Sequence, residues 1–215
     1  MVLSRRENLC LIHKNVVRLI HDGGQLFTGL ATSLADTTTI LHGTVPKDTL
    51  TSDVQTILHL RAGFQFIERY HGPVSVGMIQ HVNQIVAYDA LKPGQFAQQP
   101  MGINGIHYQP PRPSKQAAQK IINDCRHEST SPAIQAIHLM LRYDRRQFFW
   151  DGNKRTAWLT ANYYLLRHGA GVLNITSRQG KIWNRLLSRY YETGNLTQIT
   201  RWLNQNCVTA DLGSY

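Results

Sequence analysis

Residues 92–114 constrain the fold of this 215-residue chain more than any other segment, because their glycines and prolines exclude a regular helix. Most of the remaining sequence carries apolar residues at helical spacing. The sequence shows no alternation of strand-like and helix-like stretches, so an α/β fold with helices packed on a sheet is not expected. The sequence therefore predicts an all-α domain with one irregular insertion. The helix breakers in the insertion are Pro93, Gly94, Pro100, Gly102, Gly105, Pro110, Pro111 and Pro113.

The helices are placed by apolar spacing and by residues that start and stop helices. Gly23-Gly24 is expected to end the first helix. Ser75 and Ser114 can cap later helices, and Ser131-Pro132 can begin another, since proline favours the first helical turn. The predicted ranges are 5–21, 26–42, 53–70, 76–90, 115–127, 131–144, 154–168, 178–192 and 197–206.

Within the insertion, residues 101–108 alternate around Asn104-Gly105, a pair favoured in type I′ turns. This pattern predicts a small β-hairpin. An ordinary surface hairpin would show the same pattern, so the pattern alone assigns no function.

The chain carries an excess of positive charge, with 23 Lys and Arg against 13 Asp and Glu, a formal net charge of +10. This excess favours acidic partners such as nucleotides, nucleic acid or an acidic protein surface. The alternative is that the excess only keeps the protein soluble. Cys10, Cys125 and Cys207 are far apart and include no C-x-x-C, which argues against a disulfide framework or zinc site and fits a reducing cytoplasm. Neither a signal peptide nor a membrane span is expected.

The segment from Asp151 to Arg155 has the composition of an anion-binding loop at a helix start. A helix N-terminus offers unpaired N–H groups and the positive end of a dipole, and Gly152 lets a phosphate approach the backbone. Lys154 and Arg155 add positive charge, and Asn153 adds an amide donor. Asp151 offers a hard oxygen for Mg²⁺. The segment predicts a site for a nucleotide's phosphates; the alternative is a simple turn with a helix cap.

The run from Arg145 to Arg155, RRQFFWDGNKR, resembles the motif of the Fic/Doc (Fido) family, H-x-F-x-[DE]-G-N-[GK]-R-x-x-R. The resemblance implies a Fido helical bundle with a small β-hairpin flap. It divides the chain into an N-terminal helical extension (1–69), a core with the flap and anion-binding loop (70–170) and C-terminal helices packed on the core (171–215). The lysine in the loop is most similar to the Doc branch.

The same resemblance implies roles for individual residues. Phe149 falls on a core anchor and Asp151 on the ligand of Mg²⁺, while the anion loop would bind the phosphates of ATP. The stretch 102–111 resembles the family's flap, which pairs with the backbone of a target protein. The anion-loop residues are Gly152, Asn153, Lys154 and Arg155, and the flap residues are Gly102, Ile103, Asn104, Gly105, Ile106 and His107.

The chain departs from the family motif at two positions. Gln147 occupies the place of the catalytic histidine, and an amide has no proton affinity near neutral pH, so an orienting role is the most it can have. Trp158 replaces the second arginine and is expected to pack in the core. Thr32 and Asp36 match the family's inhibitory helix poorly, so glutamate-mediated autoinhibition is not expected. His107 is either a substitute base or, as we prefer, a solvated loop residue.

Three functions remain open. The chain is a transferase that moves AMP or phosphate from a nucleotide to a target-protein hydroxyl, or an inactive Fic pseudo-enzyme that acts as a nucleotide-binding or regulatory, toxin–antitoxin-type partner. The third and least favoured is a nucleic-acid-binding protein that uses Arg142, Arg145, Arg146, Lys154, Arg155 and Arg167. No membrane partner is expected, and the sequence leaves the oligomeric state open.

Overall fold

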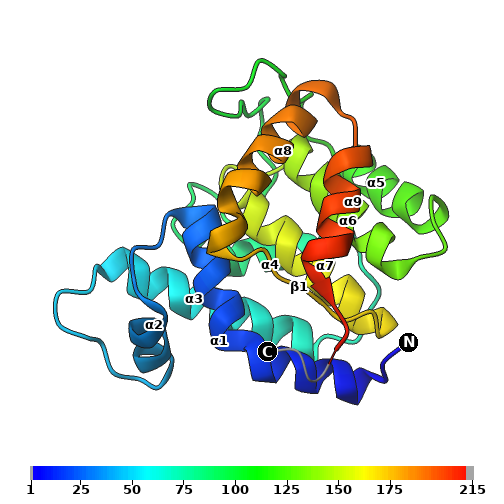
Figure 1. Cartoon of the computed structure of the whole chain (residues 1–215). Helices are drawn as coiled ribbons and strands as arrows, with labels where there is room; N and C mark the ends of the chain where they lie inside the picture. Colours follow the sequence, from blue (N-terminus) through cyan, green and yellow to red (C-terminus); the bar gives the residue numbers. More distant parts are fainter. Residues whose placement is uncertain (1, 212–215) are drawn as a thin grey trace.

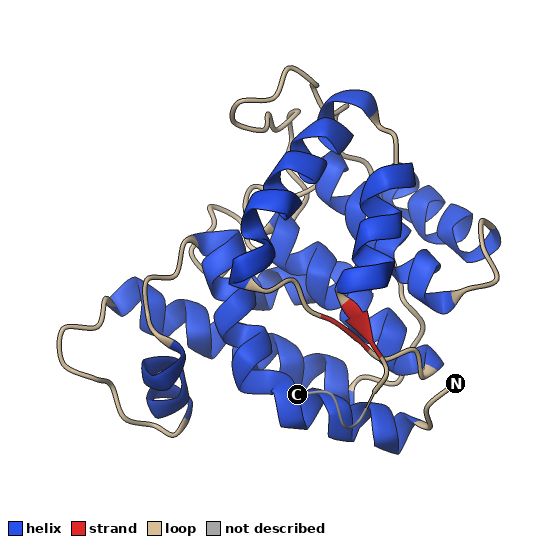
Figure 2. Cartoon of the chain, in the orientation of Figure 1, coloured by secondary structure: helices blue, strands red, loops and turns tan. Residues whose placement is uncertain are grey.

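A computed structural model describes residues 2–211, which form a bundle of helices (Figure 1). The all-α prediction is confirmed, and two very short strands are the main addition (Figure 2). None of the described helices is long and apolar enough to cross a bilayer. In chain order the elements are α1 (Arg5–Thr28), α2 (Leu34–Leu41), α3 (Thr51–Arg69), α4 (Val76–Val86), α5 (Lys115–His127), α6 (Pro132–Arg146), α7 (Asn153–His168), β1 (Val172–Leu173), the 3₁₀ turn η1 (Ser177–Gln179), α8 (Gly180–Thr193), α9 (Thr197–Asn206) and β2 (Val208–Thr209).

Helix α7 lies at the centre of the bundle, in contact with α1, α3, α4 and α6. Thirteen of its 16 residues are buried, and they include polar residues such as Thr156, Thr160 and Asn162. Trp158 packs edge-on against Phe64 and at a tilt against Phe27. Trp158, Tyr163 and Tyr164 are buried, and the predicted core position of Trp158 is confirmed.

Several helix starts agree with the sequence because a serine caps them. Ser75, Ser114 and Ser131 each accept a hydrogen bond from the backbone N–H three residues later, at the starts of α4, α5 and α6. Helix α7 ends at His168, as the predicted range 154–168 has it, and Gly169 follows in the left-handed conformation.

The prediction that Gly23-Gly24 ends the first helix is wrong. Helix α1 continues to Thr28 and ends at Gly29, which has φ 74°. The two glycines instead allow close packing, because a Cβ on Gly23 would lie 2.9 Å from the Trp158 ring and one on Gly24 would lie 2.8 Å from Leu30. Two neighbouring predictions change as well: α2 begins at Leu34 instead of 26, and α4 ends at Val86 instead of 90.

The predicted hairpin at 101–108 is a turn without paired strands. The Ile106 N–H donates to the Ile103 carbonyl (3.1 Å), but only Gly105 of the central pair has a positive φ. A type I′ turn needs positive φ at both central residues, so the turn is closer to type II. The antiparallel strand pair lies elsewhere, between β1 and β2.

Candidate functional site

A cleft of about 420 Å³ opens where α6 ends and α7 begins. It brings together three groups that the sequence analysis selected: the anion loop, Gln147 and the first half of the predicted flap. The end of α1 adds Phe27. The lining residues are Phe27, Met101, Gly102, Ile103, Asn104, Gln147, Trp150, Asp151, Gly152, Asn153, Lys154 and Arg155.

The second half of the predicted flap does not line this cleft. The side chain of His107 is 99% exposed and lies 3.2 Å from Glu192, and the His107 backbone N–H donates to the same carboxylate (2.7 Å). His107 is therefore not placed to accept a proton inside the cleft.

Gly152 precedes the first turn of α7 with φ 71°, a left-handed conformation that favours glycine. A Cβ at this position would lie 2.6 Å from the Cβ of Ala87, just after α4. No side chain caps this helix, so the N–H groups of its first turn have no capping partner and can bind an anion. Close packing thus demands glycine here in addition to any need for phosphate approach.

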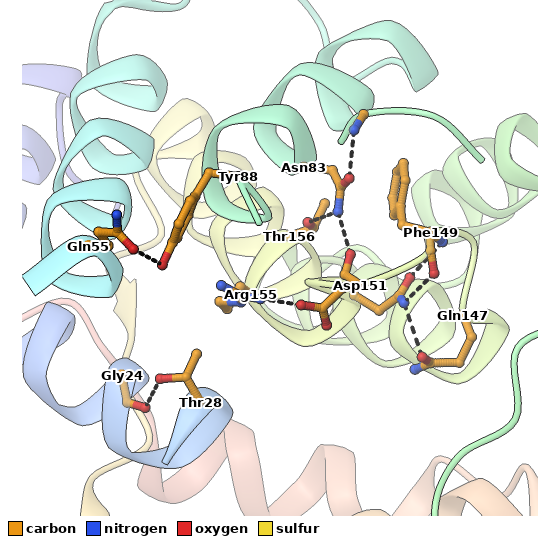
Figure 3. A network of polar contacts seen from close by, with 12 residues as sticks. Gly24, Thr28, Gln55, Asn83, Tyr88, Gln147, Phe149, Asp151, Arg155 and Thr156 are labelled. Atoms are coloured by element: carbon orange, nitrogen blue, oxygen red, sulfur yellow. Dashed lines mark hydrogen bonds and ion pairs between the residues drawn. The ribbon is translucent and has the colours of Figure 1, made fainter. Parts of the chain in front are cut away.

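The buried side chain of Asn83 holds this loop against α4 (Figure 3). Its Nδ2 donates to the Asp151 carbonyl (2.9 Å) and to Thr156 Oγ1 (3.0 Å), while its Oδ1 accepts from the Gly94 N–H (2.9 Å). Sequence analysis did not select Asn83. The available signal was an amide residue within the apolar face of α4, next to the buried Val82.

Asn153 shapes the loop from within. Its Oδ1 accepts from the Phe149 N–H (2.9 Å), and its Nδ2 donates to the Phe149 carbonyl (2.9 Å) and to Gln147 Oε1 (3.1 Å). The amide that we expected to meet phosphate is therefore already engaged in the loop.

The charges in the cleft come from Lys154, Arg155 and Asp151. Arg155 Nη2 lies 2.9 Å from Asp151 Oδ2; the arginine side chain is 8% exposed and the carboxylate side chain 57% exposed. Residues 2–211 contain no cluster of three side chains that could hold a metal by themselves. One exposed carboxylate beside an anion loop nevertheless fits Mg²⁺, which commonly takes one or two carboxylates and completes its shell with phosphate oxygens and water.

Gln147 ends α6 in the left-handed conformation, with φ 47°. Its Nε2 donates to the Asp144 carbonyl (2.6 Å) and to Asp144 Oδ1 (3.2 Å), and its Oε1 accepts from Asn153. Because oxygens of Asp144 accept these bonds, the NH₂ group of the amide faces Asp144. Oε1 keeps a second lone pair that can accept a hydrogen bond from a hydroxyl.

Asp144 is a buried carboxyl behind Gln147, and Tyr191 of α8 donates to its Oδ2 (2.6 Å). Burial raises the pKa of Asp144 to about 6, although hydrogen bonds from Tyr191 and Gln147 and the charge of Lys154 act in the opposite direction. The sequence analysis did not select Asp144 because its partner Tyr191 is distant in sequence.

The weak candidates for an inhibitory segment lie away from the cleft. Thr32 donates to Asp53 (2.7 Å), and Asp36 accepts from Ser33 (2.7 Å) at the start of α2. Neither lines the cleft, and the N-terminal region reaches it through Phe27 instead.

Comparison with known proteins supports the fold. Residues 73–165 match the model of the Fic/DOC family. A Fic-domain-containing signalling protein from Bacteroides thetaiotaomicron superposes with a TM-score of 0.74 at 18% identity, over 94% of this chain and 86% of that chain. Fic-1 from C. elegans superposes with a TM-score of 0.75 at 17% identity, over 91% of this chain but only 62% of that chain.

A third solved structure, IbpAFic2 covalently tethered to Cdc42, superposes with a TM-score of 0.52 at 14% identity, over 94% of this chain and 69% of that chain. No match was found among curated proteins. The matched segment 73–165 contains the turn at 101–108, Gln147 and the anion loop. Residues 73–165 therefore match the Fic/DOC family, and the chain has the fold of solved Fic proteins.

Proposed function

We propose that the cleft binds the phosphates of ATP with Mg²⁺, and that the chain transfers AMP or phosphate to a hydroxyl of a target protein at a reduced rate. The supporting observation is that the anion loop, Gln147 and residues 101–104 line one cleft. A nucleotide at the start of α7 and a target segment beside 101–104 would meet at Gln147. The Fic relative that was solved tethered to Cdc42 supports a protein as the acceptor.

In this proposal the nucleotide is held by the first turn of α7. The unpaired N–H groups and the helix dipole attract phosphate, and Lys154 and Arg155 neutralise its charge. Asp151 would hold Mg²⁺, which neutralises charge on phosphate oxygens when bound.

Gln147 would orient the target hydroxyl through the free lone pair of Oε1. It cannot take the proton, and general base catalysis is typically worth about 10²–10⁴-fold in rate. Phosphoryl transfer depends mainly on positioning and charge neutralisation, so the loss of the base slows the reaction without abolishing it.

A binding module without catalysis is the second candidate. The supporting observation is that Asp144 and Asn153 already hold the Gln147 amide, and the described residues that line the cleft include no histidine. Such a protein would bind the nucleotide and act as a regulatory or toxin–antitoxin-type partner.

Calorimetry with Mg-ATP tests the common part of both candidates. We expect binding that weakens about 10-fold or more in Lys154→Ala, because a charge-assisted contact to phosphate is lost. Lys181→Ala, an exposed lysine on α8, is the matched control and should bind as the wild type does. Undetectable binding to the wild type would reject both candidates.

Labelling then separates the two candidates. The wild type and Gln147→His are incubated with a cell lysate, Mg²⁺ and ATP that carries a radiolabel on the α- or the γ-phosphate. If the wild type labels proteins with both α-labelled and γ-labelled ATP, simple AMP transfer is excluded. Label from α-labelled ATP alone indicates AMP transfer, and label from γ-labelled ATP alone indicates phosphate transfer. Label that appears only with Gln147→His supports the binding module.

A further inference from the structure

A second cavity, of about 350 Å³, lies between α5, α6 and α8, at the C-terminal end of α6. We call it the Arg146 groove. Four cationic side chains and two carboxylates line it, together with an alanine, an isoleucine and a tyrosine. The lining residues are Ala117, Lys120, Ile121, Asp124, Glu128, Arg142, Arg145, Arg146 and Tyr190.

Two of the four cations are neutralised within the groove. Lys120 Nζ lies 2.8 Å from Asp124 Oδ2, and Arg142 Nη1 lies 2.6 Å from Glu128 Oε1. Both carboxylates are thereby used, so the charges of Arg145 and Arg146 remain uncompensated.

These two arginines differ in how they are held. Arg145 donates through Nε to the Tyr191 carbonyl (2.9 Å), and its guanidinium carbon lies 3.5 Å from the centre of the Tyr108 ring. Arg146 makes no hydrogen bond or ion pair with the residues 2–211, and its Nε is buried without a partner. Its two Nη groups are not among the buried atoms and also make no hydrogen bond with the described residues, so they are the donors that a bound carboxylate would meet.

The groove adjoins the cleft. Arg146 lines the groove and the next residue, Gln147, lines the cleft, while Tyr108 follows the flap turn and covers Arg145. An extended segment rises about 3.3 Å per residue, so a target segment beside the flap would bring a side chain a few residues from its modified hydroxyl within reach of Arg146.

We propose that the Arg146 groove binds an aspartate or glutamate side chain of the target protein, a proposal that rests on the function proposed above. A guanidinium group binds a carboxylate through two parallel hydrogen bonds, and Arg146 has donors available for this. A nucleic-acid backbone fits less well, because Asp124 and Glu128 would repel a continuous row of phosphates whereas a single carboxylate meets the two uncompensated guanidinium groups.

Fluorescence anisotropy with a fluorescein-labelled peptide of alternating glutamate and serine tests this proposal. A peptide of alternating glutamine and serine is the neutral control, and both are titrated at low salt with the wild type, Arg146→Gln and Arg185→Gln. Arg185 is an exposed arginine on α8 and controls for the general effect of one lost charge. We expect Arg146→Gln to weaken binding of the acidic peptide by about fivefold or more and Arg185→Gln to weaken it by less than about twofold.

Equal losses in the two variants, or equal affinity of the wild type for the acidic and neutral peptides, would overturn the proposal. A DNA oligonucleotide that binds more tightly than the acidic peptide and loses the same affinity in Arg146→Gln would assign the groove to nucleic acid and also overturn it. Mg-ATP affinity is measured on the same samples. If the wild type does not bind Mg-ATP, the proposed function is rejected. If Arg146→Gln binds Mg-ATP with unchanged affinity but binds the acidic peptide more weakly, the result supports a subsite for acidic side chains that is separate from the nucleotide site.

Discussion

Replacing Gly152 with alanine should destabilise the chain by about 2–5 kcal/mol. The first contribution is conformational, since φ is 71° and the left-handed region costs a residue with a Cβ about 1–2 kcal/mol. The second is steric, since the new Cβ would lie 2.6 Å from the Cβ of Ala87, which is fully buried. Overpacking of this kind typically costs about 1–3 kcal/mol.

Two other glycines separate these contributions. Gly29 has φ 74° with no atom within 4 Å of a built Cβ, so Gly29→Ala should show the conformational cost alone, about 1–2 kcal/mol. Gly77 lies in α4 with no atom within 4 Å, so Gly77→Ala should stabilise the helix by about 0.5–1 kcal/mol. Equilibrium unfolding in urea, followed by circular dichroism, gives the three free energies.

The decisive quantity is the difference between Gly152→Ala and Gly29→Ala. If Gly152→Ala costs no more than Gly29→Ala, the contact with Ala87 relaxes freely and the close packing of the anion loop on α4 is wrong. We also expect Gly152→Ala, but not Gly77→Ala, to weaken Mg-ATP binding, because the loop must shift to relieve the contact.

Three further substitutions test other parts of the site and core. Asp144→Asn removes a carboxyl whose pKa burial raises to about 6. In the wild type the folded state binds this proton more tightly than the unfolded state does. Relative to the variant, the wild type should therefore lose roughly 3 kcal/mol of stability as the pH rises from about 4 to about 6. A difference in unfolding free energy that is constant with pH would contradict this. Asn153→Ala leaves the buried Phe149 N–H without its acceptor, so it should cost about 1–3 kcal/mol in urea unfolding and weaken Mg-ATP binding, and an unchanged midpoint would refute the role of this amide. Gly23→Ala places a Cβ 2.9 Å from Trp158 and should cost about 1–3 kcal/mol in thermal unfolding, whereas a rise in Tm would show that the helix tolerates the side chain.

Local sequence signals predicted the fold class and most of the helices. Ser114 and Ser131 mark helix starts through their own backbone geometry, and Gly169 marks a helix end for the same reason. The hairpin prediction at Asn104-Gly105 failed because a turn-forming pair does not ensure that the flanking residues pair as strands. The prediction at Gly23-Gly24 failed because glycine serves close packing as well as helix termination.

The candidate site likewise has parts that the sequence predicted and parts that only the structure revealed. The composition of residues 151–155 indicated an anion loop at a helix start, and the structure places those residues around one cleft with Gln147. The cleft's supports could not be read from the sequence. Asn83 is 68 residues from the carbonyl that it holds, and Tyr191 is 47 residues from Asp144.

By itself the sequence determined where several helices start, through their serine caps, and which loop carries the positive charge, since both depend on neighbouring residues alone. It also showed that Gln147 stands where the motif that it resembles has a histidine. Only the tertiary structure decided that Asp144 lies buried behind Gln147 with Tyr191 as its donor, and that Nε of Arg146 has no hydrogen-bond partner. The physical reason is that burial and hydrogen-bond partners depend on which distant helices pack together, and it is this packing that sets pKa values and leaves donors free to bind a ligand.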